Sequence, residues 1–388
     1  MNAKQTDQPQ ADDNVAGGPA ASAKRPQYLF TQLRTIAIIG ALITILSCFG
    51  ATNWIADLFA QLRFQWTVCW AFVVLGFALT RRWVWLGVSL AGMLVCGYPM
   101  LPYVQAQVLI VGEENVVFSR PGLYRLMSLN VLTSNQNWQE VIDLIETEDP
   151  DFLVLMEVDQ TWQQQLEILG ETYAYSKFQS REDNFGIAFL SKYAWSNIEL
   201  FRLGKNGVPS IDVHFSKLDM EREAEQLRLI ATHPIPPLGE RAWKSRNEQL
   251  FSVANRLNSR DFGTGQEGND QAGNGKFSSS QTGEEGLDMS VSGPCTANIV
   301  VGDLNLAPWS PNFEKVLVLG GLRDSARGFL PRPTWYVFPT WLGGLKIDHA
   351  LVGATINVYR HRVGPNVGSD HRAVVLDFAI SSSPTASN

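Results

Sequence analysis

Residues 298–305 read NIVVGDLN, a short apolar run of strand length followed at once by glycine and polar residues. Three other stretches share this pattern, and each ends in a residue that can bind metal or phosphate: 126–129 before Asn130, 152–156 before Glu157, and 227–232 before His233. Apolar runs without alternation are typical of strands buried on both faces, as in layered α/β architecture. We therefore expect the polar residues to gather along one rim of the sheets.

Helix-like segments lie between these strands. Apolar residues recur at helical spacing over 138–146, 161–169 and 240–258. The segment 259–294 breaks the alternation, because it holds eight Gly and six Ser in 36 residues. Such a composition cannot bury enough surface to fold. We expect a disordered insertion there, within a catalytic domain over 111–380 that ends in a disordered tail, 381–388.

A strongly apolar region precedes this domain. Its runs 35–56, 64–80 and 83–104 are each close to the roughly 20 residues that cross a bilayer. Four charged residues interrupt the whole region: Asp57, Arg63, Arg81 and Arg82. We expect a membrane anchor of three transmembrane helices after a disordered cytoplasmic N-terminus, residues 1–34. Three runs in succession disfavour a cleaved signal peptide for the first.

The Lys and Arg residues beside the runs predict the orientation of the anchor. Lys24, Arg25 and Arg34 precede the first run, and Arg81 and Arg82 form most of the turn after the second. The positive-inside rule places these residues in the cytoplasm. Three crossings then put the domain on the extracytoplasmic side, whereas a second run that fails to cross would return it to the cytoplasm.

The net charge of −7 understates the acidity of the domain. Beyond residue 110 the chain has 24 basic and 34 acidic residues, a formal charge of −10. Nonspecific binding to nucleic acid depends on Lys and Arg that neutralise phosphates. A nucleic acid is therefore disfavoured as a partner. The four cysteines show no pairing pattern, so we expect no structural disulfide.

Carboxylates and imidazoles concentrate at the C-terminal side of the domain. The set consists of Asp303, Asn305, Asp348, Asp370 and His371. Residues two apart on a strand face the same way, so Asp303 and Asn305 can share a site. The same parity turns His349 away from Asp348 and excludes it as a primary catalytic residue. Oxygen ligands without sulfur suit a hard cation, Mg²⁺ or Mn²⁺.

Six motifs in this order resemble the endonuclease/exonuclease/phosphatase superfamily of metal-dependent phosphoesterases. They are Ser128-Leu129-Asn130-Val131, Leu155-Met156-Glu157-Val158, Ala231-Thr232-His233-Pro234, Gly302-Asp303-Leu304-Asn305, Ile347-Asp348-His349 and Ser369-Asp370-His371. The resemblance implies an α/β fold, a four-layered α/β sandwich of two packed mixed sheets flanked by helices, here preceded by about three transmembrane helices. One departure is Met156, where members often have Gln.

The resemblance also implies which residues hold the cofactor, Mg²⁺ or Mn²⁺. Glu157 would be the principal metal ligand, with Asn130 beside it. Asp370 would support the metal or its water. These three residues are our predicted metal site.

The same resemblance implies a catalytic role for five residues. Asp303 would orient or deprotonate the attacking water, and Asn305 would hold a phosphoryl oxygen. His371, kept charged by Asp348, would stabilise the charge that develops on the phosphoryl group. His233 would donate to another phosphate oxygen.

Two further residues are weaker candidates for binding substrate. Asn184 lies in a loop that resembles a site-lining loop of the family, although a plain turn explains it equally well. Arg246 lies on the helical segment after Pro236-Pro237 and could meet a substrate headgroup, although a solvated helix face is the simpler interpretation.

These features predict an enzyme: a membrane-anchored, metal-dependent phosphoester hydrolase with its catalytic domain outside the cytoplasm. A site tethered near the bilayer and an acidic domain favour a phosphorylated substrate at the membrane surface, namely a lipid-linked phosphate, pyrophosphate or phosphodiester headgroup. Two alternatives stay open. One is an extracytoplasmic nuclease, and the other is a non-catalytic membrane receptor or scaffold that reuses the fold.

Overall fold

The computed structural model of the protein describes residues 20–104, 122–218, 226–258, 297–336 and 343–381. The chain forms two compact units. The first consists of Met1–Ile45 and Trp66–Cys96, and the second of Leu46–Gln65 and Gly97–Asn388. The disorder expected for residues 1–19, for 259–294 and for the tail beyond residue 381 lies outside the described residues, so it stays a prediction.

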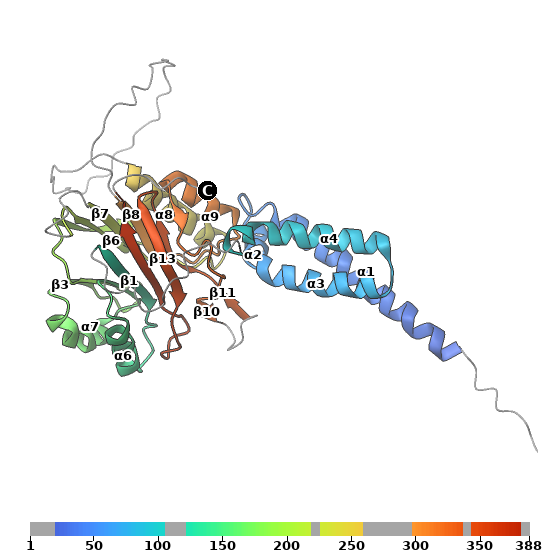
Figure 1. The fold of residues 1–388 in the computed structure, drawn as a ribbon, viewed down its shortest axis with the longest axis horizontal. Helices are drawn as coiled ribbons and strands as arrows, with labels where there is room; N and C mark the ends of the chain where they lie inside the picture. Colours follow the sequence, from blue (N-terminus) through green and yellow to red (C-terminus); the bar gives the residue numbers. More distant parts are fainter. Residues whose placement is uncertain (1–19, 105–121, 219–225, 259–296, 337–342, 382–388) are drawn as a thin grey trace, which may run out of the picture. The chain divides into compact units, whose positions relative to one another are not determined.

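Three apolar helices, lying side by side, form the first unit (Figure 1): α1 (Ala20–Ser47), α3 (Arg63–Leu79) and α4 (Trp83–Gly97). Trp70 of α3 packs against Gly40 of α1 and Gly92 of α4, where an added β-carbon would lie 3.0 and 2.4 Å from the indole ring. Small residues of this kind let apolar helices approach closely. The indole Nε1 of Trp70 also donates to Thr44 Oγ1 at 3.0 Å.

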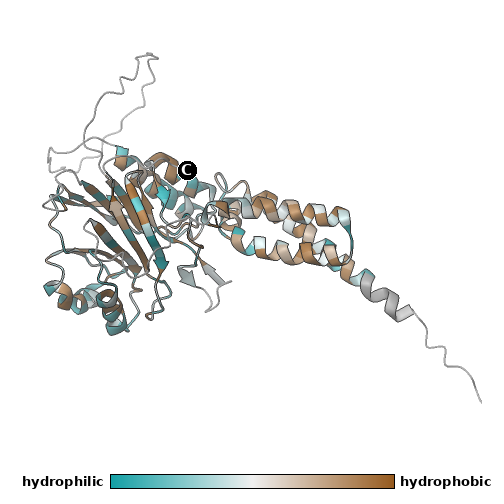
Figure 2. Cartoon of the chain, viewed as in Figure 1, coloured by the Kyte–Doolittle hydropathy of each residue, from teal (hydrophilic) through white to brown (hydrophobic). Residues whose placement is uncertain are grey.

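Most residues of these helices are hydrophobic, as the brown colour in Figure 2 shows. Large aliphatic side chains are exposed along all three helices: Ile38, Leu42, Ile45, Leu75, Leu79, Val84 and Leu94. Two helices in the described part of the chain, Gln27–Ser47 and Trp83–Val104, are long and apolar enough to cross a membrane. A third span results if α2 (Trp54–Gln61) and α3, which are bent by 64°, count as one.

The first helix differs from the predicted run at both ends. It begins at Ala20, so the disorder expected for residues 20–34 is wrong, and the reason is that Phe30 and Leu33 pack on the apolar core of the unit. It ends at Ser47, and the last residues of the predicted run 35–56 turn into a separate helix, α2. Asn53 caps α2 by accepting a backbone N–H of its first turn at 3.1 Å.

The other two predicted runs are helical in the structure. The run 64–80 corresponds to α3, and 83–104 corresponds to α4 with its continuations η1 (Tyr98–Met100) and α5 (Leu101–Val104). The segments α2, η1 and α5 belong to the second unit.

Two six-stranded sheets form the body of the second unit. The first contains β1 (Leu123–Asn130), β2 (Phe152–Met156), β3 (Tyr175–Gln179), β4 (Ile187–Ser191), β13 (Ile356–Val363) and β14 (Val374–Ile380) in the order β13-β14-β1-β2-β4-β3. The second contains β5 (Asn197–Leu203), β6 (Val208–Phe215), β7 (Leu227–Thr232), β8 (Ala297–Asp303), β9 (Arg323–Asp324) and β12 (Asp348–Val352) in the order β5-β6-β7-β8-β12-β9. A separate ribbon pairs β10 (Trp335–Tyr336) with β11 (Gly344–Leu345).

Helices cover the outer face of each sheet, so the unit has four layers (Figure 1). The helices α6 (Trp138–Glu148) and α7 (Gln160–Leu166), which continues into η3 (Glu167–Glu171), lie on the first sheet. The helices α8 (Glu240–Asn258) and α9 (Pro311–Gly320) lie on the second. Buried rings fill the space between the sheets, among them Phe152 and Phe215 at 5.1 Å. The expected α/β sandwich is confirmed.

Asp212 on β6 is a buried carboxylate held by two arginines. Arg228 donates to its two oxygens at 3.0 and 2.8 Å, and Arg256 donates to one of them at 2.8 Å. Burial alone would raise the pKa of Asp212, but hydrogen bonds from His214 and these arginines lower the pKa well below its usual range. Its contribution to stability is therefore present above the pKa of an unfolded Asp, about 4, and is lost as the pH falls.

We expect Asp212→Asn to lower the free energy of unfolding at neutral pH by about 3–5 kcal/mol, because two arginines lose a buried counter-charge. The difference from wild type should narrow below about pH 4, where Asp212 of the unfolded chain is protonated. Denaturant unfolding of the full chain in detergent micelles, from neutral to acid pH, measures this. The exposed Glu171→Gln is the control. An equal loss of stability at every pH would contradict the assignment.

Candidate active site

The rim where the two parallel strand pairs end carries the site. Each sheet has one such pair among its described strands, β1 with β2 and β7 with β8. Asn130 ends β1 and Glu157 follows β2, while His233 follows β7 and Asp303 ends β8. Parallel neighbours point their carboxyl ends the same way, so each pair delivers two polar side chains to one edge. The edges meet, because Asn130 Nδ2 lies 2.8 Å from Glu157 Oε1 and 3.3 Å from Asp303 Oδ2.

Several residues around this rim, Leu132 among them, hold the left-handed backbone conformation without being glycine. The angle φ is +61° at Glu157, +50° at Asn305 and +64° at Asn184. Each such residue costs about 1–3 kcal/mol and persists only where its surroundings enforce it. Thr133 Oγ1 donates to the carbonyl of Glu157 at 3.0 Å, and the N–H of Asn305 donates to Asp303 Oδ1 at 2.9 Å. The strained backbone therefore lies at residues that form or border the site.

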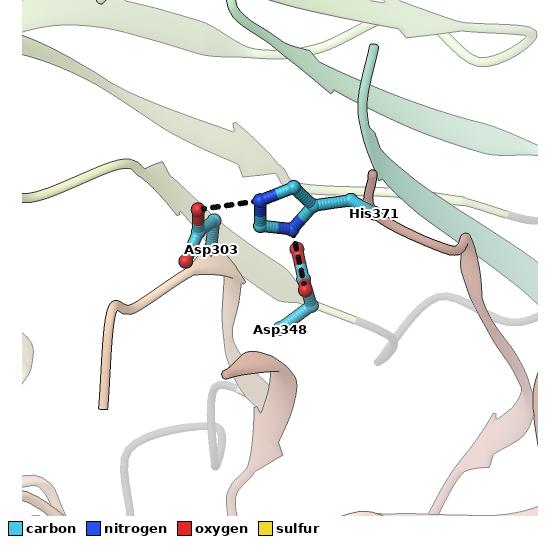
Figure 3. Close-up of side chains that lie close together, drawn as sticks. All are labelled: Asp303, Asp348 and His371. Carbon is cyan, nitrogen blue, oxygen red and sulfur yellow. Dashed lines mark hydrogen bonds and ion pairs between the residues drawn. The ribbon is translucent and has the colours of Figure 1, made fainter. Parts of the chain in front are cut away.

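Asp303, Asp348 and His371 form a buried chain of charges (Figure 3). The two carboxylates lie opposite each other on the antiparallel strands β8 and β12. His371, from the loop before β14, places Nδ1 2.9 Å from Asp348 Oδ2 and Nε2 3.6 Å from Asp303 Oδ2. One ligand atom from each residue lies within 4.8 Å of the others.

Neighbouring charges determine the protonation states of His371 and Asp303. Burial lowers the pKa of His371, but the charges of Asp348 and Asp303 outweigh burial and raise the pKa to about 10. Burial raises the pKa of Asp303, but His371 and His233 lower it to about 2. At neutral pH the site therefore holds an imidazolium that can donate from both nitrogens, beside a carboxylate that only accepts. Such preset donors and acceptors can stabilise charge that develops on a phosphoryl group.

His233 and Asn305 complete the surroundings of Asp303. His233 Nε2 lies 3.4 Å from Asp303 Oδ2, and its buried Nδ1 has no hydrogen-bond partner among the described residues. Asn305 Nδ2 donates to a backbone carbonyl of the segment after β7 at 3.0 Å. The ring of Phe185 packs on that of His233 at 5.4 Å, which brings the loop of the exposed Asn184 to the edge of the site.

A comparison with protein families identifies this arrangement. The sequence profile of the Endonuclease/Exonuclease/phosphatase family matches residues 127–261 and 284–371, more than half of the chain. The chain belongs to this family. Among curated proteins, none matches the chain significantly.

Solved structures of similar fold share little sequence with this family member. An endonuclease/exonuclease/phosphatase from Beutenbergia cavernae DSM 12333 is 17% identical over 67% of this chain and 72% of its own, with a TM-score of 0.47. The human Nocturnin catalytic domain, with a bound sulfate, is 19% identical over 67% of this chain and 95% of its own, with a TM-score of 0.46. The 3′ phosphatase NExo from Neisseria, bound to a product DNA hairpin, is 18% identical over 66% and 99%, with a TM-score of 0.46.

Members of this family depend on a divalent metal ion, and the rim offers donors that fit one. Glu157 and Asp303 both direct a carboxylate oxygen at the same amide group of Asn130. Asp370 accepts Trp335 Nε1–H on Oδ2 at 2.8 Å, while its buried Oδ1 has no hydrogen-bond partner among the described residues. A buried carboxylate oxygen without a donor is costly unless a cation or water satisfies it. This donor set suits Mg²⁺ or Mn²⁺.

Of the two candidate metal positions at the rim, the one beside Glu157 fits better. The cluster of Asp303, Asp348 and His371 is compact enough to hold an ion. However, both ring nitrogens of His371 are directed at carboxylates, Nδ1 at Asp348 and Nε2 at Asp303. Glu157, Asn130 and Asp370 therefore remain the predicted ligands, and His371 remains a donor toward substrate.

Two residues lie behind the rim. The guanidinium of Arg246 is fully buried and donates to Asp57 and Asn247 and to the carbonyl of Asn305. Contrary to the prediction, Arg246 thus faces the protein interior and no substrate headgroup. His349 is also turned away, as its strand parity predicts, with Nε2 2.9 Å from the carbonyl of Leu306.

Several residues that support the site were not identified from the sequence. Ser369 Oγ donates to the carbonyl of Asn130 at 2.7 Å and accepts the N–H of His371 at 3.0 Å. Thr334 Oγ1 accepts the N–H of Asp348 at 3.0 Å. Ser369 stands inside the Ser-Asp-His motif, so its place was a usable signal. The sequence around Thr334 gives no such signal, because the role of Thr334 depends on a contact made only in the folded chain.

Met156, the departure from the family pattern, contacts β8, the strand that ends in Asp303. Its Sδ accepts the N–H of Asp303 at 3.0 Å. The neighbouring Gly302 has φ +143°, and a β-carbon there would lie 2.0 Å from the carbonyl of Thr232 and 3.2 Å from Met156 Sδ. Glycine is therefore required at this crossing. The thioether, a weak acceptor, takes a role that a Gln side-chain oxygen could also fill.

We expect Met156→Leu to lower the free energy of unfolding by about 1 kcal/mol, because a buried N–H loses its acceptor while the apolar volume is retained. In a domain of this size that loss shifts the melting temperature by about 2–4 °C. Met156→Gln keeps an acceptor and should stay closer to wild type. Thermal unfolding of the three proteins in detergent measures the difference. Equal losses for Leu and Gln would show that the contact with Asp303 has no energetic role.

Proposed function

We propose that this protein is a membrane-anchored, divalent-metal-dependent phosphoester hydrolase that acts on a lipid-linked phosphate, pyrophosphate or phosphodiester headgroup. The observation that carries the hydrolase is the buried chain from Asp348 through His371 to Asp303, beside Glu157. Buried charges cost folding free energy. A receptor or scaffold has no need to retain them.

Each site residue then has a part in phosphoester hydrolysis. A bound Mg²⁺ or Mn²⁺ would supply Lewis-acid stabilisation of a phosphoryl oxygen. Asp303 accepts a hydrogen bond from the attacking water and takes its proton. His371 donates Nε2–H to a phosphoryl oxygen, while Asp348 holds its ring in place and keeps it charged. Because negative charge on these oxygens grows toward the transition state, such preset donors favour the transition state over the bound substrate.

The connectivity of the chain supports the proposed anchor. Residues 46–65 and residues from Gly97 onward belong to the same compact unit. Tyr103 in α5, for example, donates to Asp324 of β9 at 3.0 Å. The chain therefore leaves this unit into α3 and comes back to it from α4, so either both helices cross a bilayer or neither does. The arrangement in which α1 and α4 cross but α3 does not, which would bring the domain back to the cytoplasm, is disfavoured.

A reporter that is active only outside the cytoplasm tests this topology. Fused after Glu114 it should be active, and fused after Arg82 it should be inactive, because Lys24, Arg25, Arg81 and Arg82 favour the cytoplasmic side. Activity at both positions would exclude the hairpin of α3 and α4. The reverse pattern would place the catalytic domain in the cytoplasm.

A pocket in the second unit supports a lipid as the substrate. It has a volume of about 500 Å³, and apolar side chains at the start of α3 and in η1 and α5 line one part of it: Phe64, Met100 and Val104. Arg332 and Arg372 contribute two cations to the same pocket. Arg372 directly follows His371 in the chain and its guanidinium lies over the ring of Tyr336 at 5.0 Å. An apolar space with two cations, one of them on the residue next to His371, suits the tail and phosphate of a lipid.

Hydrolysis assays with the purified full chain in nanodiscs test the function. We expect phosphate release from phosphatidic acid or a prenyl pyrophosphate, or headgroup release from a phospholipid, with Mg²⁺ present. EDTA should abolish it and excess Mg²⁺ should restore it. Asp303→Ala and His371→Ala should each reduce the rate by about 10²–10⁴-fold, because each removes a proton-transfer or charge-stabilising group.

The exposed Glu171→Ala serves as the matched control and should keep wild-type rates. Cleavage of plasmid DNA or RNA, without hydrolysis of any lipid, would instead establish the nuclease. A correctly folded protein that fails to hydrolyse even bis(p-nitrophenyl) phosphate with Mg²⁺ or Mn²⁺ would favour the receptor or scaffold.

A further inference from the structure

The carboxylate of Asp57, which lies between α1 and α3 in the chain, is buried in the second unit. Asp57 lies on α2, and its side chain is fully buried. Its Oδ2 accepts hydrogen bonds from Arg246 Nη2 at 2.8 Å and from Trp243 Nε1 at 2.9 Å, and Ser310 Oγ donates to its Oδ1. Apolar packing alone would dock a short helix without the cost of a buried charge. The charge therefore calls for a more specific role.

Arg246 connects this carboxylate to the active site. While Nη2 pairs with Asp57, Nη1 donates to the carbonyl of Asn305 at 2.8 Å. Asn305 is held at φ +50°, and its own N–H donates to Asp303 Oδ1. The rigid guanidinium fork thus fixes the distance between α2 and the strained residue that orients Asp303.

The same segment of chain contacts the rest of the loop that follows Asp303. We name residues 50–65 the connecting segment and residues 304–310 the catalytic loop. Arg63 Nη1 donates to the carbonyl of Trp309 at 3.2 Å, and the N–H of Ala307 donates to Gln61 Oε1 at 3.4 Å. Just beyond the loop, Asn312 Nδ2 donates to the carbonyl of Gly50 at 3.0 Å. A loop without helix or strand structure of its own is therefore held by backbone contacts along its length.

We propose that the connecting segment positions the catalytic loop, with Asp57 and Arg246 as positioning residues that hold Asn305 and, through it, Asp303. The connecting segment, which lies between α1 and α3 in the chain, is then part of the catalytic machinery. A soluble fragment that begins at residue 111 lacks Asp57, leaves Arg246 buried without its counter-charge, and frees the catalytic loop. The inference goes beyond the proposed function, because it concerns the geometry of the loop whatever the substrate.

Substitutions in the full chain in detergent test this role. Asp57→Asn keeps the shape of the side chain but removes the charge, and Arg246→Lys keeps the charge but cannot hold Asp57 and Asn305 together. We expect both to lower kcat for bis(p-nitrophenyl) phosphate at saturating Mg²⁺ by about 10- to 100-fold, with a smaller change in KM, since small displacements of catalytic groups act on kcat. The exposed Arg241→Lys on the same helix is the matched control and should match wild type.

The double variant Asp57→Leu with Arg246→Met separates positioning from stability. It removes both buried charges, so its melting temperature should recover toward wild type, because replacing a whole buried ion pair by apolar groups is often neutral. Its kcat should stay low, because nothing donates to the carbonyl of Asn305. If kcat recovers together with the melting temperature, Asp57 and Arg246 only stabilise the fold and the proposal is overturned.

Hydrogen exchange of the catalytic loop gives a readout that does not depend on activity. The backbone amides of residues 304–310 other than Pro308 should exchange faster in Asp57→Asn and in the double variant than in wild type or Arg241→Lys. If the wild-type protein hydrolyses no phosphoester but this pattern appears, the proposed function fails and the positioning role stands. Unchanged exchange of these amides in both variants would overturn the positioning role by itself.

Discussion

The buried carboxylate of Asp303 is the interaction on which the rest of the site depends. A charge removed from water must be paired or hydrogen-bonded, and the neighbours of Asp303 come from both sheets. His371 and His233 approach its Oδ2, Asn130 reaches it from the first sheet, and the N–H of Asn305 satisfies Oδ1. The requirements of one carboxylate thus hold the rims of two sheets together, while Asp348 and Asp303 jointly raise the pKa of His371.

The architecture explains why this charge lies where it does. Among the described strands, one parallel pair in each sheet interrupts an otherwise antiparallel order, and the carboxyl ends of both pairs open at the same rim. Because parallel neighbours end at the same edge of a sheet, each pair places two polar residues there, and the two pairs lie on opposite sides of the apolar core. Catalytic residues can then sit on rigid strand ends while loops such as that of Asn184 vary around them.

Buried polar contacts also mark the places where the chain leaves and re-enters the catalytic unit. Asp57 pairs with Arg246 before α3, and after α4 Tyr103 donates to Asp324, which in turn lies 3.2 Å from Lys346 Nζ. A flexible tether would only raise the local concentration of substrate. Buried contacts at both ends instead make α2 and α5 part of the second folded unit. A domain boundary at residue 111 leaves these two helices out.

The sequence alone was sufficient for the strand-end pattern, the six ordered motifs and the apolar runs, because each depends on neighbours along the chain. Strand and helix periodicity are local properties, and so is the hydropathy of a helix that crosses a bilayer. Asp57, in contrast, reads as a loop charge and Arg246 as a residue of a solvated helix face, yet 189 residues of separation end in a 2.8 Å contact. Met156 and Thr334 are similar cases. Only the tertiary structure decided these roles, because burial and pairing depend on which distant segments pack together.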